Sequence, residues 1–145
     1  MVVCGRTESE VQSPKSKVPA ATSSAPAYLD ELSTLGENVI AEFYQERGFI
    51  ASTLSPGSFP LQRATLADLR GSDRAINAEI VRRILGGEER GPKRDAVLLN
   101  AAAALFVAGK SKTMGEGWDL AAELIDGGKA KAKLAELSSA SSMFK

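Results

Sequence analysis

Two neighbouring carboxylates, Asp30 and Glu31, are the residues of this sequence best suited to bind a metal ion. Adjacent carboxylates on a turning backbone can both face one hard cation. Magnesium prefers such oxygen ligands, commonly one or two carboxylates completed by water and substrate phosphate. Adjacent Asp-Glu pairs are also common on solvated loops, so the local sequence by itself favours a solvated pair.

Several kinds of catalytic site are excluded by residues that the sequence lacks. Histidine is absent from the 145 residues, and Cys4 is the only cysteine. A Ser-His-Asp triad, a histidine or cysteine zinc site and an intramolecular disulfide are therefore ruled out within this chain. No Gly-x-Gly-x-x-Gly or Walker-type phosphate loop occurs. Cys4 is interpreted as a small buried side chain, and the single cysteine favours a reduced, cytoplasmic location.

Other polar residues on expected helices have structural interpretations. Asn77 and Asn100 are expected to tie down a neighbouring loop or helix end, in preference to contacting a substrate. Lys93 and Arg94 lie near a helix N-terminus, where a solvated pair is expected and an anionic partner is the alternative. Trp118 is expected in the core.

Composition describes an ordinary globular chain. Lysine plus arginine balance aspartate plus glutamate at 18 each, so no net field draws the chain to nucleic acid or to an anionic membrane. Apolar residues make up 43% of the chain, and no apolar run is long enough to span a bilayer. We therefore expect no nucleic-acid partner and no membrane partner.

The first part of the chain is expected to form strands. A strand over residues 1–5 ends at Gly5, and a flexible Ser/Pro/Ala-rich linker follows over 6–28. Residues 39–44 and 49–54 alternate around a short loop ending in Gly48, the pattern of a β-hairpin.

The second part is expected to be helical. One helix, capped by Ser72 or Asp73, runs to Leu85, and a second opens at Gly91-Pro92. The second is apolar almost all round from Ala96 to Ala108, which predicts a central buried helix. Thr113-x-x-Glu116 is a capping box for a third, and a short fourth carries the residues Ala130, Leu134 and Leu137. The glycine pairs Gly86-Gly87 and Gly127-Gly128 are helix stops.

Linked motifs in this helical part carry a family resemblance. They run from Ala64 to Asp73, from Asn77 to Ile80, from Ile84 to Glu88 and from Gly91 to Leu105, and Leu124 to Ala130 continues the series. This series closely resembles the C-terminal portion of anthranilate phosphoribosyltransferases, in the glycosyltransferase family that includes nucleoside phosphorylases. The resemblance covers about Leu29 to Leu137. It implies an α/β fold: a C-terminal fragment of the phosphoribosyltransferase α/β domain, with a β-hairpin and about four helices on remnants of a sheet over residues 29–138, and a disordered tail over 139–145.

The resemblance also implies chemistry. In that family an acidic pair in a Gly-Leu-Asp-Glu motif binds the magnesium ion that accompanies phosphoribosyl pyrophosphate, and Leu29-Asp30-Glu31 matches it. Asp30 and Glu31 are therefore expected to bind Mg²⁺ in a transferase of tryptophan biosynthesis, whose substrates are phosphoribosyl pyrophosphate and anthranilate. The resemblance allows a homodimer for the complete enzyme.

The sequence departs from the family pattern in two respects. Residues 6–28 separate the first strand from the acidic pair, where family members have only a few residues, and Tyr28 replaces the motif's glycine. The family's N-terminal helical domain, its glycine-rich pyrophosphate loop and most of its anthranilate contacts have no counterpart here. We therefore expect no catalytic residue in this chain and no activity from it alone. A related enzyme with another acceptor, or a non-catalytic interaction module, are the alternatives.

Overall fold

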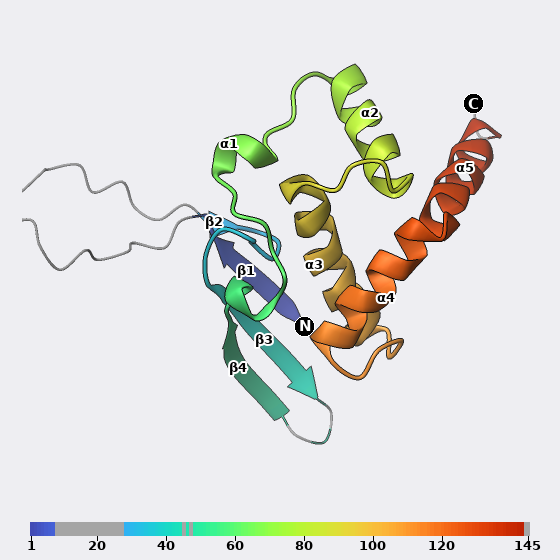
Figure 1. Ribbon diagram of the computed structural model, residues 1–145. Helices are drawn as coiled ribbons and strands as arrows, with labels where there is room; N and C mark the ends of the chain where they lie inside the picture. Colours follow the sequence, from blue (N-terminus) through green and yellow to red (C-terminus); the bar gives the residue numbers. More distant parts are fainter. Residues whose placement is uncertain (8–27, 45, 47, 144–145) are drawn as a thin grey trace, which may run out of the picture. The chain divides into compact units, whose positions relative to one another are not determined.

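The structure divides into two compact units, one built of strands and one of helices. The computed structural model describes residues 1–7, 28–44, 46 and 48–143. One unit comprises Met1–Pro60 and the other Leu61–Lys145. The boundary lies within the range 29–138 that the sequence groups together. Strands and helices are both present, which confirms the expected α/β class (Figure 1).

The first unit is a four-stranded antiparallel sheet. Its strands are β1 (Val2–Arg6), β2 (Tyr28–Leu29), β3 (Asn38–Tyr44) and β4 (Gly48–Leu54), in the spatial order β2-β1-β3-β4. A 3-10 turn at Pro56–Ser58 follows β4. The predicted hairpin is confirmed as β3 and β4, which pair along their whole length. Gly48 opens β4 with φ +73°, a conformation that glycine adopts without strain.

The expected limits of the first strand and of the linker need correction. β1 continues through Gly5 to Arg6, and Tyr28 already belongs to β2, because Arg6 and Tyr28 pair across the two strands. Gly5 does not end the strand, because its bare backbone is paired on both sides, with Leu29 and with Asn38. The rest of the predicted linker, residues 8–27, lies outside the described residues.

The second unit contains five α-helices in the part of the chain that the structure describes. They are α1 (Leu66–Leu69), α2 (Arg74–Leu85), α3 (Pro92–Val107), α4 (Met114–Asp126) and α5 (Lys129–Ser142). The single-turn α1 was not anticipated. α5 continues into the residues expected to form a disordered tail, as far as Ser142, and Ser139 and Ser142 bond to the carbonyls one turn back. None of the described helices is long and apolar enough to cross a membrane.

Helix ends follow the sequence signals closely. The Asp73 carboxylate caps α2 by accepting a hydrogen bond from the Ile76 amide at 2.9 Å. Gly87 and Gly128, which follow the ends of α2 and α4, have positive φ. The Thr113 hydroxyl accepts from the Glu116 amide at 3.1 Å, as expected. The return bond differs: the Glu116 carboxylate accepts from the Lys112 amide, one residue before the cap.

The core of the second unit lies between α3 and α4. Leu98, Leu99 and Ala102 of α3 are almost fully buried, and Trp118 is 7% exposed, which confirms it as a core residue. The two helices can approach closely because Gly117 has no side chain. A Cβ at this position would stand 2.7 Å from the Ala102 carbonyl oxygen.

The prediction of a central buried helix is confirmed, because α3 contains more buried residues than any other described helix. One face is buried, whereas Ala104 is exposed and Val107 is 60% exposed. Alanine side chains make the whole circumference of the helix apolar in sequence, but such small side chains can remain exposed to solvent. On α2, Ile84 is the one buried residue, and Ile76 and Val81 are about half exposed.

Candidate functional site

The acidic pair directly follows β2 and opens the loop that leads into β3. Asp30 and Glu31 lie at a bend in the backbone and are both exposed to solvent. Leu32 and Ser33, the next two residues, are 1% exposed. The loop therefore presents its carboxylates outward from an anchored segment, and the structure confirms the expected turning backbone.

Asn38, the first residue of β3, holds this loop from inside. Its side chain is fully buried. The amide oxygen accepts from the Ser33 backbone N–H at 2.6 Å, and the amide nitrogen donates to the carbonyl oxygens of Ser33, Gly36 and Leu54 at 3.0–3.3 Å. A buried amide with both ends satisfied fixes the chain that crosses it. Asn38 thus ties the acidic loop to the far strand of the hairpin.

Two glycines let the loop lie directly on β1. A Cβ on Gly5 would stand 2.5 Å from both the Ser33 nitrogen and its Cβ, and 2.7 Å from the Glu31 carbonyl oxygen. A Cβ on Gly36 would stand 2.8 Å from the Arg6 carbonyl oxygen. Real Cβ atoms do not approach so closely, so both positions require glycine for space. Gly5, Gly36 and Asn38 were missed by the sequence analysis, and only the short strand–loop–strand spacing around Asp30 could have pointed to them.

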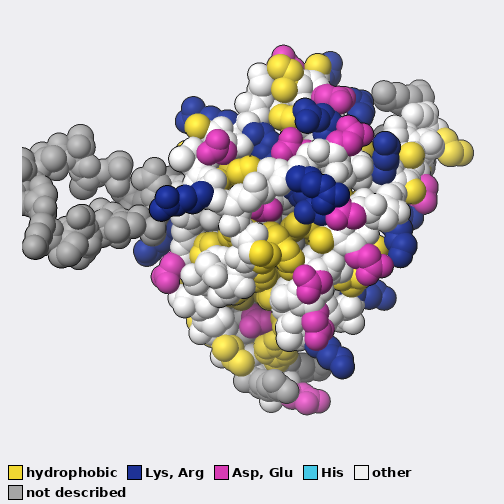
Figure 2. Space-filling model, viewed as in Figure 1, with side chains coloured by type: hydrophobic (Ala, Val, Ile, Leu, Met, Phe, Trp, Pro, Cys, Tyr) yellow, Lys and Arg dark blue, Asp and Glu magenta, His cyan; other side chains and the backbone are white. Residues whose placement is uncertain are grey.

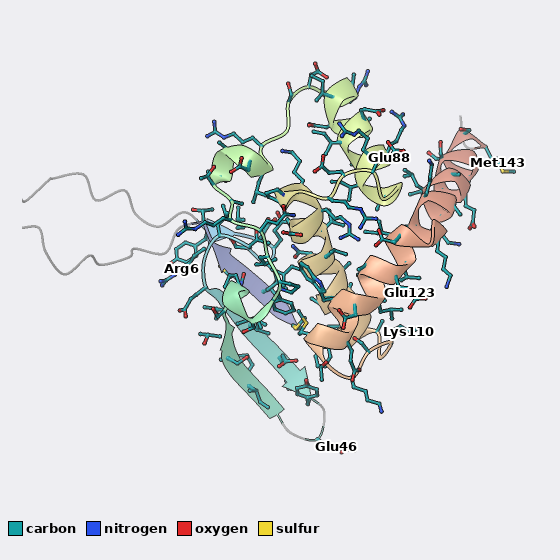
Figure 3. The ribbon with its side chains drawn as sticks, in the orientation of Figure 1. Arg6, Glu46, Glu88, Lys110, Glu123 and Met143 are labelled. Atoms are coloured by element: carbon teal, nitrogen blue, oxygen red, sulfur yellow. The ribbon has the colours of Figure 1, made fainter. Side chains whose placement is uncertain are left out.

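Tyr28, which stands where the family motif has glycine, adopts extended backbone in β2. No described residue other than glycine has a positive φ, so the tyrosine needs no turn that it would resist. Its ring lies against the Arg6 guanidinium, whose central carbon is 5.7 Å from the ring centroid (Figure 3). The substitution therefore leaves the backbone before the acidic pair in strand geometry.

The loop has the donor chemistry of a magnesium site of the kind that substrate completes. Asp30 and Glu31 supply two exposed carboxylates, and the buried Thr34 hydroxyl in the same loop has no hydrogen-bond partner among the described residues. Within those residues no three acidic, cysteine or histidine side chains gather around one point. Two carboxylates fit Mg²⁺, which usually keeps several waters and takes the remaining ligands from phosphate.

The predicted polar residues of the helical unit have structural roles. Asn77 exchanges two hydrogen bonds with the Ser72 backbone, at 2.8 and 3.0 Å, and so ties down the loop before α2 as predicted. Asn100 donates to the Ala96 carbonyl one turn back in its own helix, at 3.0 Å. This hydrogen bond lies within α3.

The prediction of a solvated pair at Lys93 and Arg94 is wrong. The Arg94 side chain is 11% exposed and its Nη2 lies 3.0 Å from Asp126 Oδ1, at the end of α4. Arg90 reaches the same carboxylate at 3.2 Å. Lys93 donates to the Asp68 backbone carbonyl. Burial of Arg94 follows from its place on the inner face of α3, which a helix N-terminus alone does not reveal.

Hydrogen bonds from Thr65 hold the pKa of Asp68 low. The Thr65 backbone N–H and hydroxyl donate to Asp68 Oδ2 at 2.7 and 2.8 Å, and these bonds lower the pKa below its usual 3.8. Such bonds favour the ionised form. The shift is explained by local capping at α1 and gives no sign of a catalytic site.

A shallow pocket of about 210 Å³ lies between α2 and α5, and its lining is charged. It contains Glu79, Arg82, Arg83, Glu88, Lys131 and Leu134. The cations face carboxylates within 4.0 Å, in the pairs Arg82–Glu79, Arg83–Glu89 and Lys131–Glu88. The paired charges leave no side of the pocket with a distinct preference for anions or cations.

Comparison with known proteins identifies related chains. The family model described as "Glycosyl transferase family, a/b domain" matches residues 15–131. The chain is 50% identical over 109 residues to an anthranilate phosphoribosyltransferase of Caulobacter vibrioides, covering 75% of this chain and 31% of the relative. It is 47% identical over 111 residues to the enzyme of that name from Phenylobacterium zucineum, covering 77% of this chain and 32% of the relative.

A solved structure gives the same result at the level of the fold. The crystal structure of anthranilate phosphoribosyltransferase from Thermus thermophilus superposes with a TM-score of 0.66 at 41% identity, over 74% of this chain and 31% of that chain. The chain therefore spans about a third of the length of the relatives that it matches.

Proposed function

The chain belongs to the glycosyl transferase family, and from that membership we propose that it forms the C-terminal part of an anthranilate phosphoribosyltransferase. The complete enzyme would transfer the phosphoribosyl group of phosphoribosyl pyrophosphate to anthranilate, in tryptophan biosynthesis. One observation carries the proposal: about half of the residues are identical to an enzyme of that name over 109 positions. The exposed acidic pair on an anchored loop supports it.

Asp30 and Glu31 would hold the magnesium ion of this reaction. Magnesium there would stabilise the charge that grows on the leaving pyrophosphate. The carboxylates need not touch the reacting carbon, because their task is to fix a cation beside the phosphates. Their exposure leaves them accessible to a bound substrate, and the buried Asn38 amide keeps the loop that bears them in place.

We expect no turnover from the isolated chain. Holding two substrates in line can account for about 7–11 kcal/mol of a reaction barrier. The sequence contains the acidic pair but no glycine-rich loop whose backbone amides could cradle pyrophosphate. In this chain alone the metal should bind weakly, since substrate phosphate normally completes its ligands.

A chimaeric enzyme tests the assignment. The matching segment of the Caulobacter vibrioides enzyme is replaced by this chain, and anthranilate consumption is followed by its fluorescence at varied magnesium concentration. Asp30→Asn with Glu31→Gln should lower kcat/KM and raise the magnesium concentration needed for half-maximal rate. The control is Glu46→Gln, an exposed carboxylate at the hairpin turn (Figure 3). A double variant with the same magnesium dependence as the control would show that the pair is only a solvated loop feature.

A further inference from the structure

β4 is the outer strand of the sheet in the first unit, and its far side is unpaired. In the strand order β2-β1-β3-β4, it pairs with β3 and with no other strand that the structure describes (Figure 1). All seven residues of Gly48–Leu54 take part in that one ladder. The N–H and C=O groups on the other side of an edge strand can pair with another polypeptide strand.

β4 lacks the features that usually protect an edge strand. Such strands are commonly very short, or they carry charged residues, proline or a bulge. The β4 sequence GFIASTL contains no charged residue and no proline, and its pairing with β3 runs without a bulge. Phe49–Thr53 are all exposed, with Phe49 at 69% and Ile50 at 41%. Hydrophobic side chains are visible beside the turn of the hairpin (Figure 2). This edge therefore has the character of an interaction surface.

The residues of β4 match in size with the same strand run in the opposite direction. When two copies lie antiparallel with full overlap, Ala51 of one copy faces Ala51 of the other. Phe49 then faces Thr53 of the second copy. Ile50 likewise faces Ser52. Each large side chain meets a small one, and pairs of an aromatic with a β-branched residue are favourable across strands. The strand is thus complementary to itself.

The charges that flank β4 favour the same antiparallel arrangement. The exposed Glu46 lies at the hairpin turn, just before the strand. Antiparallel pairing places it near Pro56 of the second copy, in the uncharged stretch Ser55–Ser58. Parallel pairing would instead bring the two Glu46 side chains together, and like charges opposite each other are destabilising.

From this self-complementarity we propose that β4 is a self-association edge, at which two copies of the chain pair antiparallel about a two-fold axis at Ala51. The two four-stranded sheets then join into one continuous sheet. Because both copies use the same surface, the assembly closes as a dimer. The pairing needs neither metal nor substrate, so its test is independent of the function proposed above.

Exchange of charge at Ala51 tests both the pairing and its register. Sedimentation of the unchanged chain over rising concentration should show a monomer–dimer equilibrium. Ala51→Lys and Ala51→Glu each place like charges opposite each other across the axis, so each variant alone should raise the dissociation constant at least about tenfold. Mixing the two variants should restore the dimer, because opposite charges then face each other. Position 51 is exposed in the single chain, so either charge is compatible with the fold.

Matched controls separate this edge from the rest of the chain. Val107→Lys and Val107→Glu change an exposed residue of the helical unit and should dimerise as the unchanged chain does, alone or mixed. Hydrogen exchange of the β4 amides that point away from β3 should slow as the unchanged chain is concentrated, and should not slow in Ala51→Lys. Protection of the β3 amides in every variant verifies that the sheet is folded.

Four results would overturn the self-association edge. The first is a chain that stays monomeric up to about 1 mM, the range of weak association. The second is a dimer that the Ala51 variants form as readily as the unchanged chain. The third is loss of the dimer in both single variants without recovery on mixing, because position 51 then does not face itself. The fourth is assembly beyond a dimer, which a closed two-fold interface does not allow.

Discussion

Replacing Asn38 by alanine should loosen the loop that bears the acidic pair. The buried amide has two N–H groups and one carbonyl oxygen, all of them engaged with backbone. Its removal loses about three hydrogen bonds at roughly 1 kcal/mol net each, and part of the desolvation cost of the abandoned groups adds to this. We expect the β1–β3 region to be destabilised by about 2–4 kcal/mol.

Hydrogen exchange measures this local effect directly. Because 1.4 kcal/mol is tenfold in an equilibrium, exchange of the β3 amides should accelerate roughly 30- to 1,000-fold. The matched control is Asn77→Ala, an amide that also makes two bonds to backbone but is exposed in the helical unit. Water replaces its bonds, so its cost should stay near 1 kcal/mol. An acceleration below threefold in the Asn38 variant would refute the idea that this amide anchors the loop.

Two further predictions concern the helical unit. Leu98→Ala should lower the free energy of unfolding by about 3–5 kcal/mol because the site is 1% exposed, whereas Leu105→Ala, at a half-buried site, should lower it by about 1–2 kcal/mol. Urea melts followed by Trp118 fluorescence measure both values, and an equal loss at the two sites would contradict this expectation. The lowered pKa of Asp68 means that its bonds stabilise α1 above the ordinary pKa of 3.8, and that this contribution is lost as pH falls through the lower folded value. Thr65→Val removes the hydroxyl bond, so an NMR titration should show the pKa of Asp68 moving up toward its usual value, and an unmoved pKa would exclude that bond as a cause.

The sequence predicts the elements better than it predicts what they bury. Asp73, Thr113 and the glycine pairs mark helix ends through local bonds, so α2, α3 and α4 begin and end where expected. Burial depends on partners that are distant in sequence. This is why Arg94, polar and placed at a helix N-terminus, lies inside against Asp126, while Val81 and Val107 are exposed.

The candidate site shows the same division. Asp30 and Glu31 could be singled out by their type and by their match to a family motif, and the structure places them on a turning, exposed segment. Their supports could not be anticipated. The need for glycine at position 5 arises from a close approach to Ser33, and the role of Asn38 arises from a loop folded back over its side chain. Both are contacts created by the fold, and neither residue type signals them alone.

The pairing of Arg6 with Tyr28 offers a practical handle for protein engineering. The two residues are cross-strand partners, so the stretch at 8–27 begins and ends at neighbouring points of one sheet. The closure entropy of a connection between two fixed ends grows only with the logarithm of its length, so that lengthening this one should cost little. An affinity tag or a fluorescent reporter could therefore be spliced into this stretch, away from both chain termini, with little cost to the strands that carry the carboxylates. Shortening it to a tight turn would be equally compatible with the β1–β2 ladder.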